Sequence, residues 1–446
     1  MGRMVTSAGT ISTHTYIYTS NTKQGSCGGI LAGVVNGNLV ILGIHTAGNG
    51  ISGMANRLSP MQDQGIRTCI QVFDKPLYHQ PRETKYRKSP LYTSSGMEPA
   101  ALSMNDPRLP DWLRGTDDMA DHAGAKYLGN IFDPPIAPFE AAKAWVMQKI
   151  RPVVGRVSCM SYNMAISEVI PMDWSTSPGL KYKGYSKRQL VEMESFQQDV
   201  DRQLEHPGTY FTTYLKDELR PVEKARIGKT RAIEACNFDY VIAYRMVNGA
   251  IYKRIYADGH AASGLAVGIC PYTHWAGLVS NLKKYCLCLD FKGFDGSLPP
   301  ELMRAGVEIL ANCHDDPELV RRIHEPTIVS TNYVTNKIYL VDGGMCSGSP
   351  CTTVLNSICN NIAAVTIALS CGASEEDLYV VSYGDDLIIS CDKPFDLEAV
   401  TTYYLKFFGM LVTNTKKSEK LQWVPSGDME FLKRKTVVFK PLNWLV

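Results

Sequence analysis

The sequence predicts an α+β body that contains an antiparallel sheet, preceded by a short segment built from antiparallel strands alone. After residue 64, strand-like and helix-like runs alternate without the regular strand-helix-strand repeat of a parallel sheet. From Thr10 to Asn56, short β-branched or alternating runs are separated by Gly and Asn, which is typical of a sandwich or barrel. Composition changes between the two parts: residues 1–64 hold four charged side chains, whereas the other 382 hold 86.

The overall composition excludes several classes of protein. The 446 residues are 45% hydrophobic and 20% charged, which excludes a disordered, collagen-like or small disulfide-stapled chain. Thirteen cysteines without a CxxC pair argue against a disulfide framework and structural zinc, and favour a reducing compartment. No apolar run is long enough for a membrane span, and the nearest, Ile362 to Cys371, predicts a buried helix. A net charge of +2 leaves any basic surface to be local.

The elements of the larger part follow from local patterns. The stretch from Lys75 to Pro99 has no sustained period and predicts extended chain. Apolar residues at helical spacing predict helices at Pro138 to Lys149, Ser186 to His206, Pro299 to Leu310 and Ile358 to Leu369. Short β-branched and apolar runs predict strands at Tyr285 to Phe291, Ser330 to Leu340, Leu378 to Ser382, Leu387 to Ser390 and Thr436 to Phe439.

Carboxylates stand at the ends of two of these predicted strands. Tyr383-Gly-Asp-Asp386 has strand-forming residues on both sides, which predicts a hairpin with two carboxylates at its tip. Asp290 ends an apolar strand, and Asp295 follows five residues later. If the two strand ends meet, Asp290 and Asp385 offer hard oxygen ligands to Mg²⁺. Because Gly-Asp is also ordinary turn chemistry, these two motifs alone support metal-dependent phosphoryl transfer and unrelated surface acids equally.

Two further segments bear on this choice. Residues 216–231 carry six basic side chains against three acidic ones. Such a run is more often a solvated face, but beside carboxylates it would neutralise the charge of a triphosphate. The small-residue stretch from Gly343 to Asn356 is either a plain loop with a helix N-cap or a backbone that approaches a nucleic acid closely. Thr352 and Asn356 would then share one helix face.

From about residue 65 to the end, these segments stand in an order that resembles the picornavirus-type RNA-dependent RNA polymerases. Asp290-Phe-Lys-Gly-Phe-Asp295 is similar to the first palm motif, whose leading Asp binds both metal ions and whose trailing Asp contacts the incoming ribose. Tyr383-Gly-Asp-Asp386 is similar to the third, in which Asp385 is the principal metal ligand and Asp386 its neighbour. The second motif, which senses the 2′-hydroxyl and positions the template, is matched by Ser347, Gly348, Thr352 and Asn356.

The remaining motifs of this family are matched as well. Gly409 to Ser418 resembles the fourth, which places Lys417 where the family has its general acid for pyrophosphate. Phe431-Leu-Lys-Arg434 resembles the primer-gripping hairpin, and Thr176-Ser-Pro-Gly179 resembles the template-channel motif, although Leu180 and Lys181 replace an expected aromatic residue and proline. The basic motif that cradles triphosphate and template is matched by Lys216, Arg220, Lys224, Lys229 and Arg231.

The resemblance implies a right-hand fold with fingers at about 65–280 and 300–340, and palm at about 281–299 and 341–430. Only the start of a thumb is expected, at about 431–446, so that we expect a chain cut short at both ends. Template-directed RNA synthesis is the implied reaction, with two Mg²⁺ ions for which Mn²⁺ can substitute. The implied partners are an RNA template and primer, NTPs, a small protein primer and other viral replication proteins, in the host cytoplasm at membrane-associated complexes.

Residues 1–64 resemble the end of the family's chymotrypsin-like cysteine protease. Gly25-Ser-Cys27-Gly-Gly29 would hold the nucleophile, with Thr22 and His45 lining the pocket for a substrate glutamine. Cys27 as a buried structural cysteine remains the alternative. Since the family's general base lies upstream, we expect no protease activity from this chain. Gln64-Gly65 fits a self-cleavage junction, because it coincides with the change in composition.

Two other functions remain open from the sequence. One is a cysteine endopeptidase that cleaves Gln-Gly junctions of a viral polyprotein, with Cys27 as its nucleophile. The other is an RNA-binding precursor without catalysis.

Overall fold

The structure of the protein is a computed structural model. It describes residues 2–5, 11–19, 30–35, 38–48, 52–57, 67–80, 82–90, 92–111, 113–114, 119–127, 130–167, 171–259, 261–415 and 420–435. The chain divides into two compact units, Met1–Gln64 and Gly65–Val446. The division falls at the bond where the composition of the sequence changes.

The first unit contains a five-stranded sheet in the order β1-β2-β5-β4-β3. All four pairings are antiparallel, as predicted for this part of the chain. A register irregularity in β4, between His45 and Ala47, marks its pairing with β5. The strands are β1 (Gly2–Val5), β2 (Ile11–Thr19), β3 (Ile30–Val35), β4 (Asn38–Gly48) and β5 (Ser52–Arg57).

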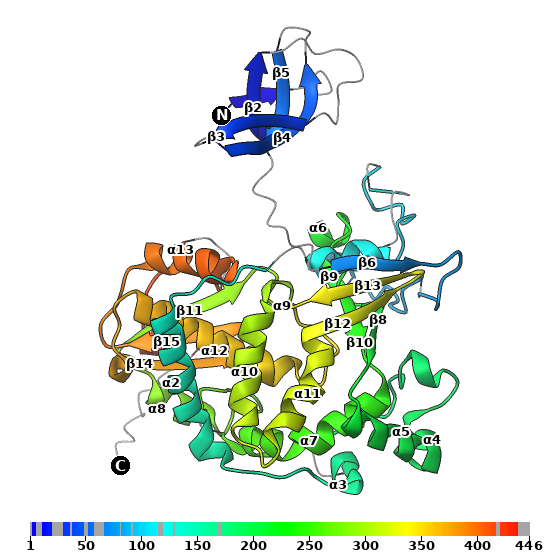
Figure 1. The fold of residues 1–446 in the computed structure, drawn as a ribbon, viewed down its shortest axis with the longest axis vertical. Coiled ribbons are helices and arrows are strands. Elements are labelled where there is room, and N and C mark those ends of the chain that lie inside the picture. Colours follow the sequence, from blue (N-terminus) through cyan, green and yellow to red (C-terminus); the bar gives the residue numbers. More distant parts are fainter. Residues whose placement is uncertain are drawn as a thin grey trace. The chain divides into compact units, whose positions relative to one another are not determined.

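The second unit contains two five-stranded sheets, which Figure 1 shows on opposite sides of the unit. We call the first the fingers sheet; its order is β10-β8-β12-β13-β6, and only the β8–β12 pairing is parallel. The strands are β6 (Arg67–Val72), β8 (Tyr210–Leu215), β10 (Ala232–Ala235), β12 (Val329–Val334) and β13 (Lys337–Asp342). This sheet draws strands from three distant stretches of the sequence.

The second sheet of this unit, the palm sheet, is antiparallel throughout. Its order is β14-β15-β11-β16, and a short fifth strand, β17, also pairs with β11. The strands are β11 (Tyr285–Phe291), β14 (Leu378–Tyr383), β15 (Asp386–Cys391), β16 (Val412–Asn414) and β17 (Val424–Pro425). The predicted α+β architecture with an antiparallel sheet is therefore confirmed.

Helices cover the palm sheet and join it to the fingers sheet. The central one is α12 (Thr352–Ser370), which packs against β14, α2, α10 and α13. It is long and apolar enough to cross a membrane by composition, yet 83% of its most apolar window is buried inside the unit, as in a core helix. The others are α1 (Met119–Ala123), α2 (Ile136–Val154), α3 (Tyr162–Ser167), α4 (Lys187–Val191), α5 (Glu194–Glu205), α6 (Val222–Ala225), α7 (Phe238–Ala257), α8 (Trp275–Asn281), α9 (Phe294–Ser297), α10 (Pro300–Ala311), α11 (Pro317–Ile328) and α13 (Leu397–Phe408).

Several short elements complete the unit. Two small two-stranded antiparallel sheets pair β7 (Met97–Pro99) with β9 (Leu219–Pro221) and β18 (Glu430–Phe431) with β19 (Arg434–Lys435). The turn between β18 and β19 places Leu432 and Lys433 at positive φ, and it forms the hairpin expected of the primer-gripping motif. The 3₁₀ turns are η1 (Tyr92–Ser94), η2 (Gly124–Lys126), η3 (Leu180–Tyr182), η4 (Glu375–Asp377) and η5 (Ser426–Asp428).

Four predicted elements differ in their bounds, among them the helix expected at residues 138–149, which extends over Ile136–Val154. The single helix expected at residues 186–206 is two helices, because α4 ends at Val191 and Met193 takes an extended conformation before α5. The run expected as one strand at residues 330–340 is the β12–β13 hairpin, whose turn holds Thr335 at a φ of 49°. Helix α12 begins six residues earlier than predicted, at Thr352. The strand predicted at residues 436–439 lies outside the described residues.

Candidate active site

The carboxylate motif Tyr383-Gly-Asp-Asp386 forms the predicted hairpin between β14 and β15. Tyr383 pairs with Asp386, so Gly384 and Asp385 make a two-residue turn. Gly384 takes a φ of 62°, in the left-handed region that favours glycine, as the first central residue of such tight hairpin turns often does. Asp385 is exposed at the turn, and Asp386 is partly buried at the start of β15.

The strand that carries Asp290 is the neighbour of β15. The antiparallel ladder between β11 and β15 ends with Leu289 opposite Leu387. The next residue of β11, Asp290, therefore comes beside the first residue of β15, Asp386. The Oδ1 atom of Asp290 accepts a hydrogen bond of 2.7 Å from the backbone N–H of Phe291. The ends of the two strands that carry the acidic motifs thus lie side by side at one end of the palm sheet.

Buried polar side chains of α12 hold the carboxylate turn from below. The backbone N–H of Gly384 donates to Ser357 Oγ at 2.8 Å, and Asn360 Nδ2 donates to the Gly384 carbonyl at 3.0 Å. Ser382 Oγ donates to the carbonyl of Ser357 at 2.9 Å. Both α12 side chains are fully buried. The sequence analysis did not single out Ser357 or Asn360; the signal that could have found them is the presence of polar residues on an otherwise apolar helix.

Asp295 lies on the short helix α9 and pairs with α12. Asn356 Nδ2 donates a hydrogen bond of 2.8 Å to Asp295 Oδ1. Burial raises the pKa of Asp295, and the negative charge of Asp385 adds to this shift; the ammonium of Lys126 and the amide of Asn356 oppose it. The predicted pair of sugar-contacting side chains is therefore brought together, and the two aspartate motifs interact electrostatically.

The other predicted residues of the second motif pack on a buried glutamate. Ser347 donates to Glu234 Oε2 through its hydroxyl at 2.8 Å and through its backbone N–H at 3.1 Å. The N–H of Gly348 donates to the Glu234 carbonyl at 3.1 Å, and a Cβ at Gly348 would lie 2.4 Å from that oxygen. Only glycine therefore allows this approach to β10. Thr352 Oγ1 lies 3.0 Å from the carbonyl oxygen of Cys346, which anchors the first turn of α12.

One open cleft collects many of these groups. Its lining includes Lys126, Arg231, Asp295, Thr352, Asn356 and Asp385. Five of these six were expected from the sequence, and Lys126 was not. Two basic side chains, the pair predicted to contact the sugar and a hairpin carboxylate therefore share one solvent-open space.

The basic segment is more neutralised than its sequence indicates. Glu218 pairs with Lys216 at 3.5 Å and with Arg220 at 3.7 Å, and it forms a bidentate ion pair with Arg231. Burial acts to raise the pKa of Glu218, but hydrogen bonding to Arg231 and the charges of all three cations outweigh it and lower the pKa. Lys224 is partly buried and Lys229 is exposed, and the described residues provide neither with an ion pair.

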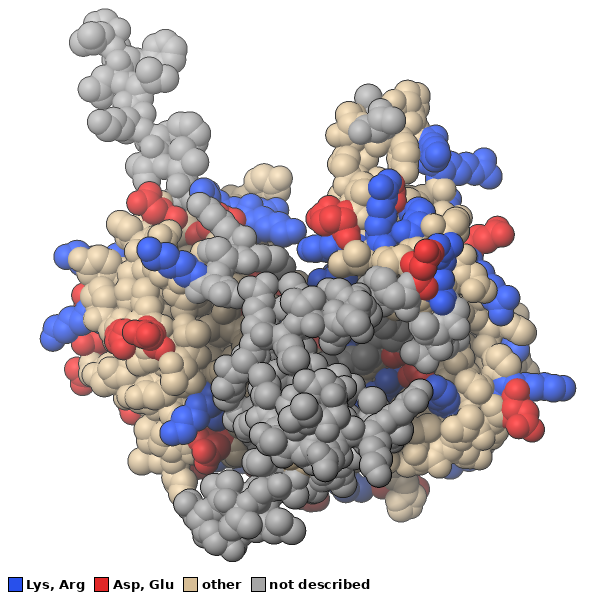
Figure 2. Space-filling view, turned by 90° about the horizontal axis from the view of Figure 1, so that it is seen from above, with Lys and Arg blue, Asp and Glu red and all other residues tan. Residues whose placement is uncertain are grey.

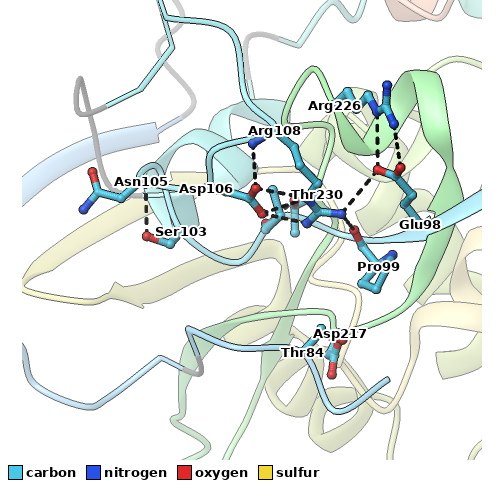
Figure 3. A network of polar contacts seen from close by, with 11 residues as sticks. Thr84, Glu98, Pro99, Ser103, Asn105, Asp106, Arg108, Asp217, Arg226 and Thr230 are labelled. Carbon is cyan, nitrogen blue, oxygen red and sulfur yellow. Dashed lines mark hydrogen bonds and ion pairs between the residues drawn. The ribbon is translucent and has the colours of Figure 1, made fainter. Parts of the chain in front are cut away.

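A second acid anchors the sixth basic side chain of this segment. Figure 3 shows Arg226 and Arg108 converging on Glu98, with N–O distances of 2.8 and 3.4 Å. Arg108 also donates to Asp106 Oδ1 at 3.0 Å and to the Pro99 carbonyl at 2.9 Å. Arg226 therefore ties α6 to residues 97–109. On the face seen in Figure 2, Lys and Arg side chains accordingly stand beside Asp and Glu side chains.

The template-channel motif is fixed to the start of α7. The N–H of Phe238 donates to the Pro178 carbonyl at 2.9 Å, and Gly179, with a φ of 97°, lies against Asn237. Lys181, which departs from the expected proline, reaches the fully buried Asp239 with an N–O distance of 2.7 Å. This ion pair gives the departure a structural role, since Asp239 would otherwise be an unpaired buried charge.

Other predicted site residues lie outside the described part of the chain. These are the general-acid candidate, the protease nucleophile and its pocket threonine, and the junction: Lys417, Cys27, Thr22, Gln64 and Gly65. His45 lies on β4, opposite Ala55 of β5, and only its place in the strand is described.

The carboxylates fit a divalent cation whose coordination sphere is completed by water and substrate. Among the described residues, no three Asp, Glu, His or Cys side chains form a group that could hold a metal ion on their own. Asp290 and Asp386 are nonetheless neighbours across the sheet, and Asp295 experiences the charge of Asp385. Mg²⁺ is commonly held by one or two protein carboxylates together with waters and substrate phosphates. Carboxylates that gather at the end of a sheet, beside a cleft lined by Asp385, fit that requirement.

Comparison with known proteins places this site in a family. The family described as "Viral RNA-dependent RNA polymerase" matches residues 89–443. The chain belongs to the viral RNA-dependent RNA polymerase family. Residues 1–50 match the family described as "3C cysteine protease (picornain 3C)". These two matches confirm the resemblances drawn from the sequence.

The related proteins are picornaviral polyproteins. The chain is 40% identical to the genome polyprotein of Ljunganvirus 1 over 98% of its own length, and 39% identical to that of human parechovirus 2 (strain Williamson) over 100%. It spans about a fifth of the length of these polyproteins, 20% and 21%. A solved structure, the Sicinivirus 3Dpol RNA-dependent RNA polymerase, is similar with a TM-score of 0.73 and 24% identity, covering 83% of this chain and 81% of that one. This likeness confirms the right-hand fold.

Proposed function

We propose that this chain carries out template-directed RNA synthesis by two-metal nucleotidyl transfer. The observation that supports it most is the pairing of β11 with β15, which brings Asp290 beside Asp386. The next residue back along the chain, Asp385, lines a cleft together with Asp295, Asn356 and Arg231. The reaction joins the 3′-hydroxyl of an RNA primer to the α-phosphate of an NTP and releases pyrophosphate.

The acidic and basic residues divide the work of binding the nucleotide. Asp290, Asp385 and Asp386 would hold two Mg²⁺ ions, for which Mn²⁺ can substitute; when bound, such ions lower the charge on the attacking hydroxyl and on the leaving pyrophosphate. Arg231 lines the same cleft and would contact the phosphates, where a positive charge favours the developing negative charge. Lys417 is proposed as the donor of a proton to the pyrophosphate.

The paired Asp295 and Asn356 would recognise the ribose. Their hydrogen bond engages one carboxylate oxygen of Asp295 and leaves the other as an acceptor on a residue that lines the cleft. Such acceptors favour a sugar that offers a hydroxyl, because an analogue without it leaves a buried polar group unpaired at about 1 to 3 kcal/mol. The arrangement therefore favours NTPs over 2′-deoxy-NTPs.

Primer extension tests the proposed reaction directly. The purified chain, a primed RNA template and NTPs should yield extended RNA with Mg²⁺, and none after chelation with EDTA. Extension should fall with 2′-deoxy-NTPs. Extension that survives chelation would contradict the two-metal reaction, and RNA binding without any extension would favour the non-catalytic precursor instead.

The remaining partners are also proposals. The polyprotein origin of the relatives supports an assembly with other viral proteins. We further propose a small protein primer and a location at membrane-associated complexes in the host cytoplasm.

A further inference from the structure

A segment far from the aspartate motifs in sequence lies directly against them. A Cβ at Gly296, the residue after Asp295, would lie 2.3 Å from the carbonyl oxygen of Lys126. A Cβ at Gly344 would lie 2.6 Å from the ring of Tyr127, whose hydroxyl donates to the Met345 carbonyl at 3.3 Å. The backbone of Lys126 thus lies tightly against α9, and the ring of Tyr127 lies tightly against the small-residue loop, which fixes the point from which the Lys126 side chain enters the cleft.

The side chain of Lys126 is shared between two carboxylates. Its Nζ atom lies 3.0 Å from Glu234 Oε2, and the side chain, 24% exposed, lines the same cleft as Asp295. Burial opposes the charge on Lys126, but the carboxylates of Glu234 and Asp295 outweigh burial and raise the pKa of its ammonium. One cation therefore balances two acids that come from different elements.

Glu234 connects this cation to the loop that carries Ser347. The glutamate side chain is only 1% exposed, and its Oε2 atom receives the ammonium of Lys126 together with both the hydroxyl and the N–H of Ser347. A buried carboxylate that loses its cation is left with an uncompensated charge, which is strongly destabilising. Lys126 thus supports Ser347 through its contact with Glu234, and it acts on Asp295 through its charge.

We propose that Lys126 is a positioning residue for sugar selection, which holds Asp295 as an ionised acceptor and Ser347 in place so that the site accepts a ribose hydroxyl. This inference rests on the proposed function. The charge of Lys126 is already engaged by Glu234 and Asp295, so that its influence on the sugar passes through these two acids. Without it, Asp295 would more readily take up a proton and lose its strength as an acceptor, since burial already raises the pKa of this carboxyl.

The test compares ribonucleotide and deoxyribonucleotide in variants of the full chain. In Lys126→Met, the ratio of kcat/KM for an NTP over its 2′-deoxy analogue should fall about tenfold, the effect of weakening one buried hydrogen bond. Lys126→Arg, which keeps the charge, should restore most of the ratio. The matched control is Lys143→Met, which removes a lysine paired with Glu140 on the surface of α2.

A double-mutant cycle separates positioning from general support of the fold. In an Asp295→Asn background, Lys126→Met should change the ratio little, because the acceptor that it holds is already gone. An unchanged ratio in Lys126→Met, with NTP and deoxy-NTP rates reduced equally, would overturn the proposal. So would an equal loss of the ratio in both backgrounds.

Two further measurements keep the inference testable. Equilibrium binding of GTP and 2′-deoxy-GTP reports the same ratio without turnover, so a chain that binds but does not extend a primer contradicts the proposed function while still testing Lys126. If Lys126→Met does not fold, the pair Lys126→Met with Glu234→Gln removes both charges, which is better tolerated than removing one. That pair should fold and still lose the preference for GTP; an unchanged preference would overturn the proposal.

Discussion

The two charged regions of the second unit are built in opposite ways. At the carboxylate edge, Asp385 stands in an exposed turn, and neutral side chains of α12 hold the backbone of that turn. In the basic segment, the charged groups themselves are held, since Glu218 pairs with three cations and Glu98 with Arg226. The first region gathers carboxylates whose turn is fixed through its backbone, whereas the second holds most of its charges in ion pairs within the protein.

The difference teaches that charge in a sequence is not charge available to a substrate. A divalent ion needs carboxylate oxygens as ligands, and here uncharged side chains fix the backbone of the turn that carries them. Phosphate contacts tolerate partly neutralised cations, because an Arg held by a carboxylate is also pre-oriented. The following predictions test this contrast, in order of expected effect.

The largest effect should come from neutralising the carboxylate edge. Asp385→Asn and Asp290→Asn should each lower primer extension by roughly 10³-fold, the scale of losing one group that stabilises transition-state charge. The matched control is Asp392→Asn, just beyond β15, whose carboxylate pairs with Lys283 at 3.8 Å. Near-normal extension by either of the first two variants would remove the metal assignment.

Removing a neutral anchor should have an intermediate effect. Asn360→Leu leaves the carbonyl of Gly384 without its donor, so the free energy of unfolding should fall by about 1 to 3 kcal/mol and kcat by about tenfold. Thermal unfolding and primer extension measure the two quantities. Thr366→Val is the control, because Thr366 is equally buried on α12 but bonds only to its own helix at Ile362. Equal losses in both variants would show that the turn needs no such anchor.

Releasing the basic segment should change how RNA binding depends on salt. Glu218→Gln frees Lys216, Arg220 and Arg231 from their shared acid, so the slope of log affinity against log salt should steepen by about one unit. Filter binding at several salt concentrations measures it, with Glu308→Gln, which removes one of the two acids paired with Arg321, as control. A slope that stays the same would mean that the cations reach RNA without leaving Glu218.

The smallest effect concerns pH. The pKa of Glu218 is lowered from its ordinary 4.5, so its ionised form is favoured by folding and its contribution to stability is present above that value. As pH falls below about 4.5, this contribution should be lost progressively. The difference in Tm between wild type and Glu218→Gln should therefore be widest near pH 7 and should shrink towards pH 3. A constant difference would show that the ion pairs contribute nothing.

The sequence predicts the strands and motifs better than the contacts between them. Strand β11 has the predicted bounds because its apolar run ends at charged residues. Helix α7 is absent from the predictions because it is buried on most sides and lacks the polar face from which an amphipathic helix is identified. Strand β6, the first strand of the second unit, is also absent from the predictions. Most of its side chains are exposed, and its strand conformation comes from pairing with β13.

The residues of the candidate site likewise fall into those that short motifs predict and those that only contacts between distant segments reveal. Asp290, Asp385, Asp295 and Asn356 could be identified because short motifs carry them in fixed spacing. Lys126 and Glu234 could not, because their roles arise from a pairing 108 residues apart in the chain. The neutralisation of Arg231 by Glu218 was also hidden, since a local count of charges does not say which of them pair.

The anchoring of the carboxylate turn has a consequence for its motions. The Gly384 N–H belongs to a solvent-facing hairpin tip, yet its acceptor, Ser357 Oγ, is buried on the central helix. Its hydrogen can exchange with solvent only when that contact with α12 opens, and core helices open last in a folded unit. The Gly384 amide hydrogen should therefore exchange as slowly as the amide hydrogens of the core. The hairpin tip lies at the surface, but its local stability should be that of the core.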